Sequence, residues 1–110
     1  DNGKIVALAD ATIISYYDYY KNLGYADLGA LYILPEYQHI GLGKKLFDKV
    51  VAEFKSHGCD KMVIGVLKDN VQARHAYEKW GGVLDNHEEM FVKLNKGYSE
   101  VFYLFDLNKL

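Results

Sequence analysis

The sequence predicts an α/β protein in which helices flank a mixed, largely antiparallel sheet. Two segments, 26–34 and 61–67, are apolar on both faces, which is typical of strands buried inside a sheet. Each is followed by a segment with helical periodicity, 42–57 and 71–80. The chain has 110 residues, enough for one core, so we expect residues 1–110 to form a single domain.

The N-terminal third is expected to contain three strands. Residues 4–14 are rich in β-branched residues and alanine, which favours a strand. The aromatic and polar stretch 15–25, with Gly24 near its end, is interpreted as a second strand or hairpin arm that leads into a turn. The buried strand 26–34 ends at Pro35, because proline cannot donate a ladder hydrogen bond.

The remaining elements are two helices, the short buried strand 61–67 and a terminal hairpin. The helix 42–57 has an apolar stripe at four-residue spacing, formed by Leu42, Leu46, Val50 and Phe54. The second helix begins after Asn70, a residue type that suits an N-cap. Strands 89–94 and 99–107 are joined by the turn sequence at 95–97 and form the hairpin.

Composition and charge exclude several classes of function. Thirteen basic residues balance 15 acidic ones without long runs, which disfavours nucleic-acid binding through a basic surface. Cys59 is the single cysteine, so no intramolecular disulfide forms, and no apolar stretch approaches the roughly 20 residues that cross a bilayer. We expect a cytoplasmic protein that binds no membrane and no metal. No metal-ligand spacing links the histidines, which are expected at the surface: His39, His57, His75 and His87.

Two glycines stand where the first helix must start. Gly41 and Gly43 either allow tight packing or let an anion approach the helix N-terminus, where unpaired N–H groups point outward. A dinucleotide-binding fingerprint would need a third glycine where Leu46 stands. A P-loop would need serine or threonine where Lys45 stands. Neither familiar phosphate-binding motif is present.

The wider context of these glycines resembles a known family. The sequence QHIGLG at 38–43 is similar to the Q/R-x-x-G-x-G/A signature of the GNAT superfamily of N-acetyltransferases. VLKDNVQARHAYEKWGG at 66–82 resembles the later strand, asparagine and helix of that family, and KGYSEVFYLFDL at 96–107 is similar to its closing strand. The resemblance covers nearly the whole chain. It implies the GNAT fold and acetyl-CoA-dependent transfer of an acetyl group to a primary amine by direct attack on the thioester.

The resemblance also implies how acetyl-CoA, as co-substrate, is held. Its pyrophosphate would sit on the backbone at the N-terminus of the first helix, and its pantetheine arm would pair with the buried strand before that helix. An asparagine would contact the arm. The positions that match are Leu31, Tyr32, Ile33, Gln38, His39, Ile40, Gly41, Leu42, Gly43, Lys44 and Asn70.

Catalytic roles are implied in the same way. The Ile33 amide would polarise the thioester carbonyl, and the Tyr77 phenol would protonate the departing thiolate. Asp27 matches the position of a glutamate that accepts a proton in many relatives, and its shorter side chain would need a water relay. Another subgroup has its glutamate where Gly65 stands here, so that route is absent.

Structural interpretations compete with these roles. Tyr77 could belong to the core, Asn70 could act only as an N-cap, and Asp27 could be a hydrogen-bonded strand residue. Three acidic residues either attract a cationic acceptor or lie in a solvated loop, and the loop is the preferred interpretation: Asp85, Glu88 and Glu89.

The acceptor side is the least determined part. Residue 3 already aligns with the second strand of the family, so its first strand and the next two helices, which form one wall of the acceptor groove, have no counterpart here. We expect either a truncated chain or a partner chain that supplies the wall, and a homodimer is one such arrangement. The acceptor is expected to be a small-molecule or peptide amine. The alternative function is a non-catalytic acyl-CoA-binding module or a fragment of an acetyltransferase.

Overall fold

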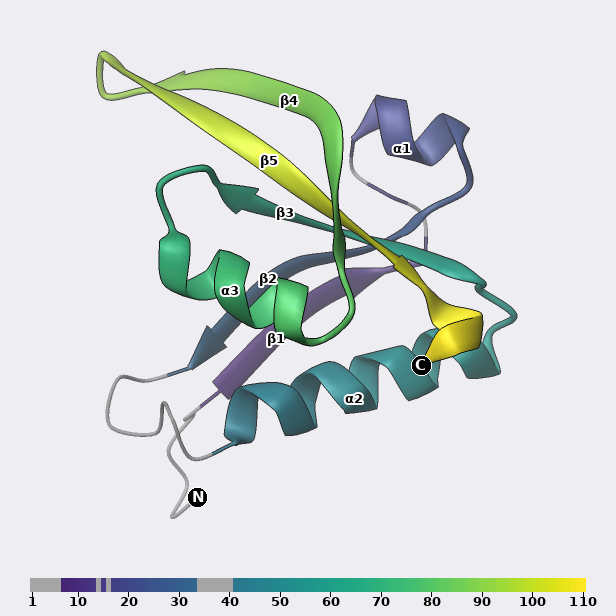
Figure 1. Cartoon of the computed structure of the whole chain (residues 1–110). Helices are drawn as coiled ribbons and strands as arrows, with labels where there is room; N and C mark the ends of the chain where they lie inside the picture. The colour runs from purple at the N-terminus through teal and green to yellow at the C-terminus, as the bar shows by residue number, and fades with distance from the viewer. Residues whose placement is uncertain (1–6, 14, 16, 34–40) are drawn as a thin grey trace.

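One mixed sheet runs through the computed structural model, which describes residues 7–13, 15, 17–33 and 41–110, with backbone alone at 7–10 and 30–33 (Figure 1). The strand order is β1-β2-β3-β5-β4, and among the described strands β2 and β3 are the parallel pair while the others are antiparallel. The predicted fold class is therefore confirmed. In chain order the elements are β1 (Ala7–Thr12), α1 (Asp18–Asn22), β2 (Ala26–Ile33), α2 (Leu42–Ser56), β3 (Lys61–Leu67), α3 (Val71–Lys79), β4 (Val83–Lys93), β5 (Lys96–Asp106) and the short 3₁₀ helix η2 (Leu107–Lys109).

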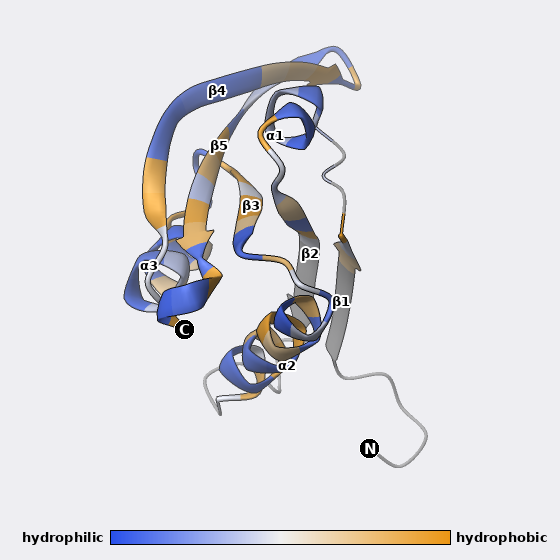
Figure 2. Cartoon of the chain, turned by 90° about the vertical axis from the view of Figure 1, so that its right-hand side faces the viewer, coloured by the Kyte–Doolittle hydropathy of each residue, from blue (hydrophilic) through white to orange (hydrophobic). Residues whose placement is uncertain are grey.

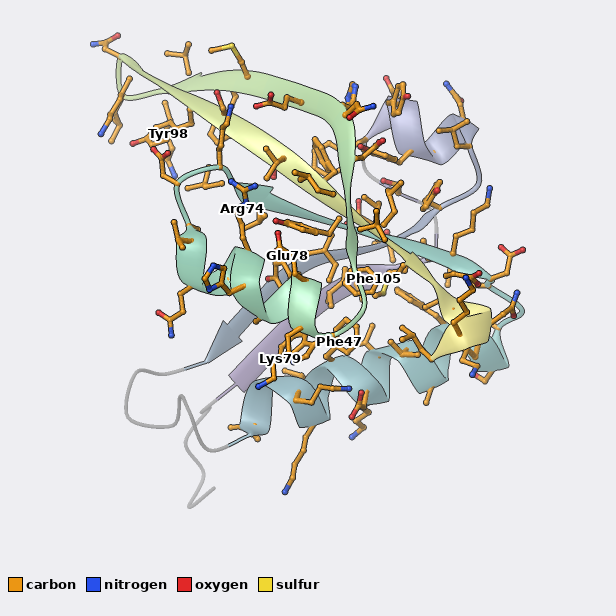
Figure 3. All side chains as sticks on the ribbon, in the orientation of Figure 1. Phe47, Arg74, Glu78, Lys79, Tyr98 and Phe105 are labelled. Atoms are coloured by element: carbon orange, nitrogen blue, oxygen red, sulfur yellow. The ribbon has the colours of Figure 1, made fainter. Side chains whose placement is uncertain are left out.

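The helices cover both faces of the sheet. Tyr103 and Phe105 of β5 point to the face covered by α2 and α3, where the larger core lies. Phe105 meets Phe47 of α2 with ring centroids 5.2 Å apart (Figure 3). Phe102 alternates with these residues along β5 and packs on the opposite face against Tyr20 of α1. Alternation along the strands thus gives each face its own apolar cluster.

The stretch 15–25 contains a helix, so the prediction of a second strand there is wrong. α1 has an acidic residue in its first turn and Lys21 in its last, which complements the helix dipole. Gly24 follows with φ +81°, a left-handed conformation that ends helices and suits glycine. One side chain, Tyr20, is fully buried under this single turn. Tertiary packing of the aromatic residues therefore overrides their preference for strands.

The terminal hairpin is confirmed, with longer strands and an earlier turn. Leu94 and Asn95 form a two-residue connection with φ values of 53° and 63°, as a type I′ turn requires. β4 begins immediately after Gly82, and Figure 2 shows its middle as hydrophilic between apolar ends. The solvated-loop interpretation is therefore wrong, because three acidic residues lie within a paired strand: Asp85, Glu88 and Glu89.

The two long helices and the central strand agree with the periodicity. α2 buries a stripe of apolar residues against the sheet, formed by Phe47, Val50, Val51 and Phe54. β3 covers the residues expected for the second buried strand, 61–67. The expected stop at Pro35 lies outside the described residues. Within the described part of the chain, the helices are too short or too polar to cross a membrane.

Candidate functional site

The two parallel strands in the middle of the sheet separate soon after they meet. β2 and β3 are in register at Ala26↔Met62 and Asp27↔Val63, and no further pairing joins them in the described part of the chain. β2 nevertheless continues to Ile33 and β3 to Leu67, so the strands diverge toward their carboxyl ends (Figure 1). The facing edges beyond the paired residues present backbone groups to this opening. An extended molecule can add to such an edge as a strand does.

The N-terminus of α2 lies close to the end of β2 at this opening (Figure 1). Its N-cap is Gly41, which has φ 82° and no side chain to cap the helix. A Cβ at Gly41 would have no neighbour within 4 Å, so the left-handed backbone, and not close packing, favours glycine there. The first turn holds no acidic residue. The first amides of α2 and the positive end of its dipole are therefore suited to an anion.

α3 begins on the other side of the opening, after the end of β3. The Asn70 side chain accepts a hydrogen bond from the Ala73 amide at 3.2 Å and so caps the helix, as one of the two interpretations predicted. With its Oδ1 engaged in the cap, Asn70 keeps its side-chain NH₂ group at the helix end, where this group can face a ligand. Asn70 is exposed, which is compatible with both roles.

Tyr77 lies two turns further along α3 and is buried. Its ring meets Trp80 and Tyr103 with centroids 5.9 and 6.0 Å apart. Burial raises the pKa of the Tyr77 phenol, which keeps the group protonated and able to donate a proton or a hydrogen bond. Tyr77 therefore belongs to the core, and the thiolate-protonating role stays a prediction.

Asp27 is fully buried at the last paired position of β2 and β3. Its Oδ2 accepts a hydrogen bond from the Ser15 hydroxyl at 2.7 Å. The side chain lies on the sheet face covered by α1, because its register partner Val63 packs there against Tyr20. The hydrogen-bonded strand residue was one interpretation of Asp27, and its role as the base stays a prediction.

Sequence reasoning did not identify Tyr17 and Glu100 as members of the site. The Tyr17 hydroxyl donates to Glu100 Oε2 at 2.8 Å, across 83 positions of the chain. Burial raises the pKa of the Glu100 carboxyl, the Tyr17 hydrogen bond lowers it, and the neighbouring Glu89 and Asp27 raise it further. No local motif contains this pair, because only the fold brings Tyr17, the residue before α1, against Glu100 of β5.

The other predicted cofactor-binding residues divide into three groups. The first-turn residues Leu42, Gly43 and Lys44 lie at the N-terminus of α2, where Lys44 pairs with Asp48 one turn further along. The backbone of Leu31, Tyr32 and Ile33 in β2 pairs with β1, with Ile33 opposite Ala7. The remaining predicted residues lie outside the described residues: Gln38, His39 and Ile40.

Other parts of the described structure offer less to a ligand. A pocket of about 400 Å³ lies where β3 begins and β5 ends, the paired end of the sheet, with Lys61 and Asp106 among its lining residues. The described residues include no group of three side chains that could hold a metal ion. His87 was expected at the surface, yet it is half-buried, stacks on Tyr19 at 4.0 Å and pairs with Glu89 at 2.9 Å.

A family model described as the acetyltransferase (GNAT) family matches residues 1–82, well over half of the chain. The chain belongs to the GNAT acetyltransferase family. The matched residues of this GNAT chain include β2 and β3, which border the opening, and α2 with its N-cap Gly41. A comparison with curated proteins gives no sequence match.

Solved structures share this fold at low sequence identity. The ribosomal-protein-S18-alanine N-acetyltransferase from Escherichia coli has a TM-score of 0.75 and 21% identity, over 97% of this chain and 64% of its own. A putative acetyltransferase from Salmonella typhimurium, determined with its cofactor acetyl-CoA, has a TM-score of 0.75 and 20% identity, over 100% and 62%. A GNAT family acetyltransferase from Elizabethkingia anophelis with acetyl-CoA bound has a TM-score of 0.72 and 15% identity, over 96% and 71%. The GNAT chain thus spans somewhat less than two thirds of the first two structures.

Proposed function

We propose that this chain binds acetyl-CoA in the opening between β2 and β3 and transfers the acetyl group to a primary amine. The observation that carries the proposal is the divergence of the two parallel strands beside an N-terminus of α2 that lacks a side-chain cap. A pantetheine arm has amide groups that can pair with the free edge of β2, and a pyrophosphate suits the amides of α2. The acetyl-CoA bound to two structural neighbours supports this assignment.

The chemistry proposed for the site is direct attack by the neutral amine on the thioester carbonyl. A backbone amide of β2, with Ile33 as the predicted donor, would stabilise the negative charge that develops on the carbonyl oxygen. The Tyr77 phenol would protonate the departing sulfur, and its raised pKa keeps it in the acid form needed for that step. The acceptor class extends from small amines to the N-terminus of a protein, as in the neighbour that acetylates a ribosomal protein alanine.

Two glycines with the same backbone conformation provide a matched test of cofactor binding. Gly41 and Gly58 have φ values of +82° and +81°, and neither has a neighbour within 4 Å of an added Cβ. Gly41→Ala and Gly58→Ala should therefore each cost about 1–2 kcal/mol of stability. Gly41 lies at the N-terminus of α2 and Gly58 beyond its C-terminus. Only Gly41→Ala should weaken binding.

The measurement is the melting temperature with and without acetyl-CoA. At 100 times the Kd, a ligand of the folded state adds about 2.7 kcal/mol, and each kcal/mol corresponds to about 4–8 °C in a domain of this size. We expect the wild type and Gly58→Ala to show the full shift and Gly41→Ala a smaller one. No shift in the wild type at millimolar acetyl-CoA would refute the proposed function.

Turnover separates the transferase from the alternative, a non-catalytic acyl-CoA-binding module. CoA release is followed with a thiol reagent while polyamines, amino acids, aminoglycosides and peptides are offered as acceptors. Tyr77→Phe should lower kcat and leave the acetyl-CoA-induced melting shift unchanged, because only the phenolic hydroxyl, the proposed acid, is removed. Stabilisation by acetyl-CoA without acetylation of any amine would favour the binding module. Equal rates for Tyr77→Phe and the wild type would limit Tyr77 to the core.

A further inference from the structure

The carboxylate of Glu100 lies over Gly65 on the sheet face covered by α1. A Cβ on Gly65 would lie 2.9 Å from Glu100 Oε2 and 3.0 Å from the Tyr17 hydroxyl. Glu100 is in register with Leu67, so its side chain leans back along β3 to reach this place. The absence of a side chain at Gly65 therefore creates the room that the carboxylate and the phenol occupy.

This place borders the opening described above. β3 has β5 on one edge, and beyond Val63 its other edge faces the space between the diverging strands. The carboxylate over Gly65 is thus one strand away from the proposed position of the thioester. It also lies on the face opposite to Tyr77, whose α3 packs against the other side of the sheet. Base and acid would approach the reacting atoms from opposite sides.

The surroundings of Glu100 are unfavourable to its negative charge. Glu89 of β4 stands directly opposite Glu100 in register, an arrangement of like charges that destabilises an antiparallel pair. Asp27 lies near enough to act on the same carboxyl. In the described part of the chain, the Tyr17 hydroxyl donates to Glu100, and the His87 ring lies 2.9 Å from Glu89. A cation placed among these carboxylates would remove the repulsion.

We propose that Glu100 is the catalytic base that takes a proton from the substrate ammonium, with Tyr17 as its positioning residue. This rests on the proposed acetyl transfer. Glu100 accepts one proton, the nitrogen lone pair forms the C–N bond, and the C–S bond breaks with its electron pair on sulfur. Sulfur takes a proton from the Tyr77 phenol, which recovers one from the new amide nitrogen. The balance is ammonium plus acetyl-CoA giving amide, CoA and the proton held by Glu100, which is released to water.

Three carboxamide variants test the assignment: Glu100→Gln, Asp27→Asn and Glu88→Gln. Glu88 is the matched control, because it lies on the same strand as Glu89 but pairs with Lys68 at 3.2 Å on the opposite face. The readouts are the melting shift with acetyl-CoA and the pH profile of kcat/KM for an amine that the wild type acetylates. Glu100→Gln should keep the melting shift, lose about 100-fold or more in kcat and lose the acidic limb of the profile. Glu88→Gln should match the wild type in its melting shift, its kcat and the acidic limb of its pH profile.

Tyr17→Phe keeps the carboxylate and gives a second, milder perturbation. The Tyr17 hydrogen bond lowers the pKa of Glu100, so its removal should move the acidic limb of the profile to higher pH. The proposal is overturned if Glu100→Gln keeps the wild-type rate and acidic limb, or if Asp27→Asn removes that limb instead. It is also overturned if Tyr17→Phe leaves the limb in place.

A direct titration separates this proposal from the proposed function. The Glu100 carboxyl carbon is followed by ¹³C NMR in CoA-saturated protein, with and without spermidine, and assigned with Glu100→Gln. An ammonium bound to the carboxylate should lower the pKa of Glu100, and an unchanged titration would refute the base. This measurement needs neither acetyl-CoA nor turnover. A protein that acetyl-CoA does not stabilise would refute the acetyl transfer and the base with it, whereas an unchanged Glu100 titration in a protein that acetyl-CoA stabilises would refute the base alone.

Discussion

Replacing Gly65 with alanine is the sharpest test of how the sheet face is packed. The new Cβ would lie 2.9 Å from Glu100 Oε2, 3.0 Å from the Tyr17 hydroxyl and 3.0 Å from Phe102 Cε1. The first two atoms end flexible side chains and can move away. Phe102 cannot, because it is fully buried and packed between Tyr17 and Tyr20 at centroid distances of 4.8 and 4.9 Å.

The expected cost follows from two opposing effects. Overpacking a core costs about 1–3 kcal/mol, and replacing glycine in a strand returns about 0.5–1 kcal/mol. Gly65→Ala should therefore destabilise the protein by about 1–2 kcal/mol, with Tm lower by about 4–8 °C per kcal/mol. It should also lower turnover, because the atoms that move belong to Glu100 and Tyr17.

Urea unfolding followed by circular dichroism measures this cost. The midpoint should fall in Gly65→Ala while the m-value stays unchanged, as for a loss of stability alone. Gly97→Ala is the control, because Gly97 also lies in a strand and an added Cβ there would have no neighbour within 4 Å. Its midpoint should equal or exceed that of the wild type. A Gly65→Ala midpoint at or above the wild-type value would refute the packing argument.

Three further predictions concern capping, packing and pH. Asn70→Ala should cost about 1 kcal/mol, seen as a lower urea midpoint, because the first turn of α3 loses its cap. Gly82→Ala should destabilise more than Gly65→Ala in the same assay, since its Cβ would meet Phe105 at 2.7 Å and a backbone oxygen at 2.9 Å. Burial and hydrogen bonds to carboxylates raise the pKa of Tyr17 and Tyr20 above the ordinary value of 10, so their contribution to stability is full below pH 10 and is lost as the pH rises further. Unfolding is measured between pH 9 and about 13, together with the tyrosinate absorbance that the wild type has in excess of Tyr17→Phe or Tyr20→Phe. This difference should appear together with unfolding, and its appearance well before unfolding would contradict the prediction.

Local pattern explains which elements could be predicted. α2 carries its apolar residues at helical spacing, and Asn70 is a residue type that caps helices, so each was predicted from a few neighbouring positions. α1 has a single turn, and its aromatic residues favour strands when considered alone. The helix forms because Tyr20 fills the space beside Phe102, a partner 82 positions away.

The site was only partly predictable for a similar reason. The glycines at the start of α2 belong to a contiguous motif, whereas the place of Glu100 over Gly65 depends on the register between β3 and β5. A one-residue shift of that register would turn Glu100 to the other face. In the sequence, Gly65 indicates only that the glutamate base of one subgroup of the family is absent from this position. In the fold, the same glycine leaves space for a carboxylate that comes from β5.

The short pairing of β2 with β3 also has a consequence for the cooperativity of folding. β1 and β2 form one part of the sheet, and β3, β5 and β4 form another. Among the residues that the structure describes, two register pairs join the parts. Core packing also connects the two parts, for example through Phe47 of α2, whose ring contacts Trp80 and Phe105 at centroid distances of 4.8 and 5.2 Å. Amides of β2 that face the opening should therefore exchange with solvent through local separation of the two parts, ahead of global unfolding. A ligand hydrogen-bonded along that edge would slow their exchange by joining both parts into one cooperative unit.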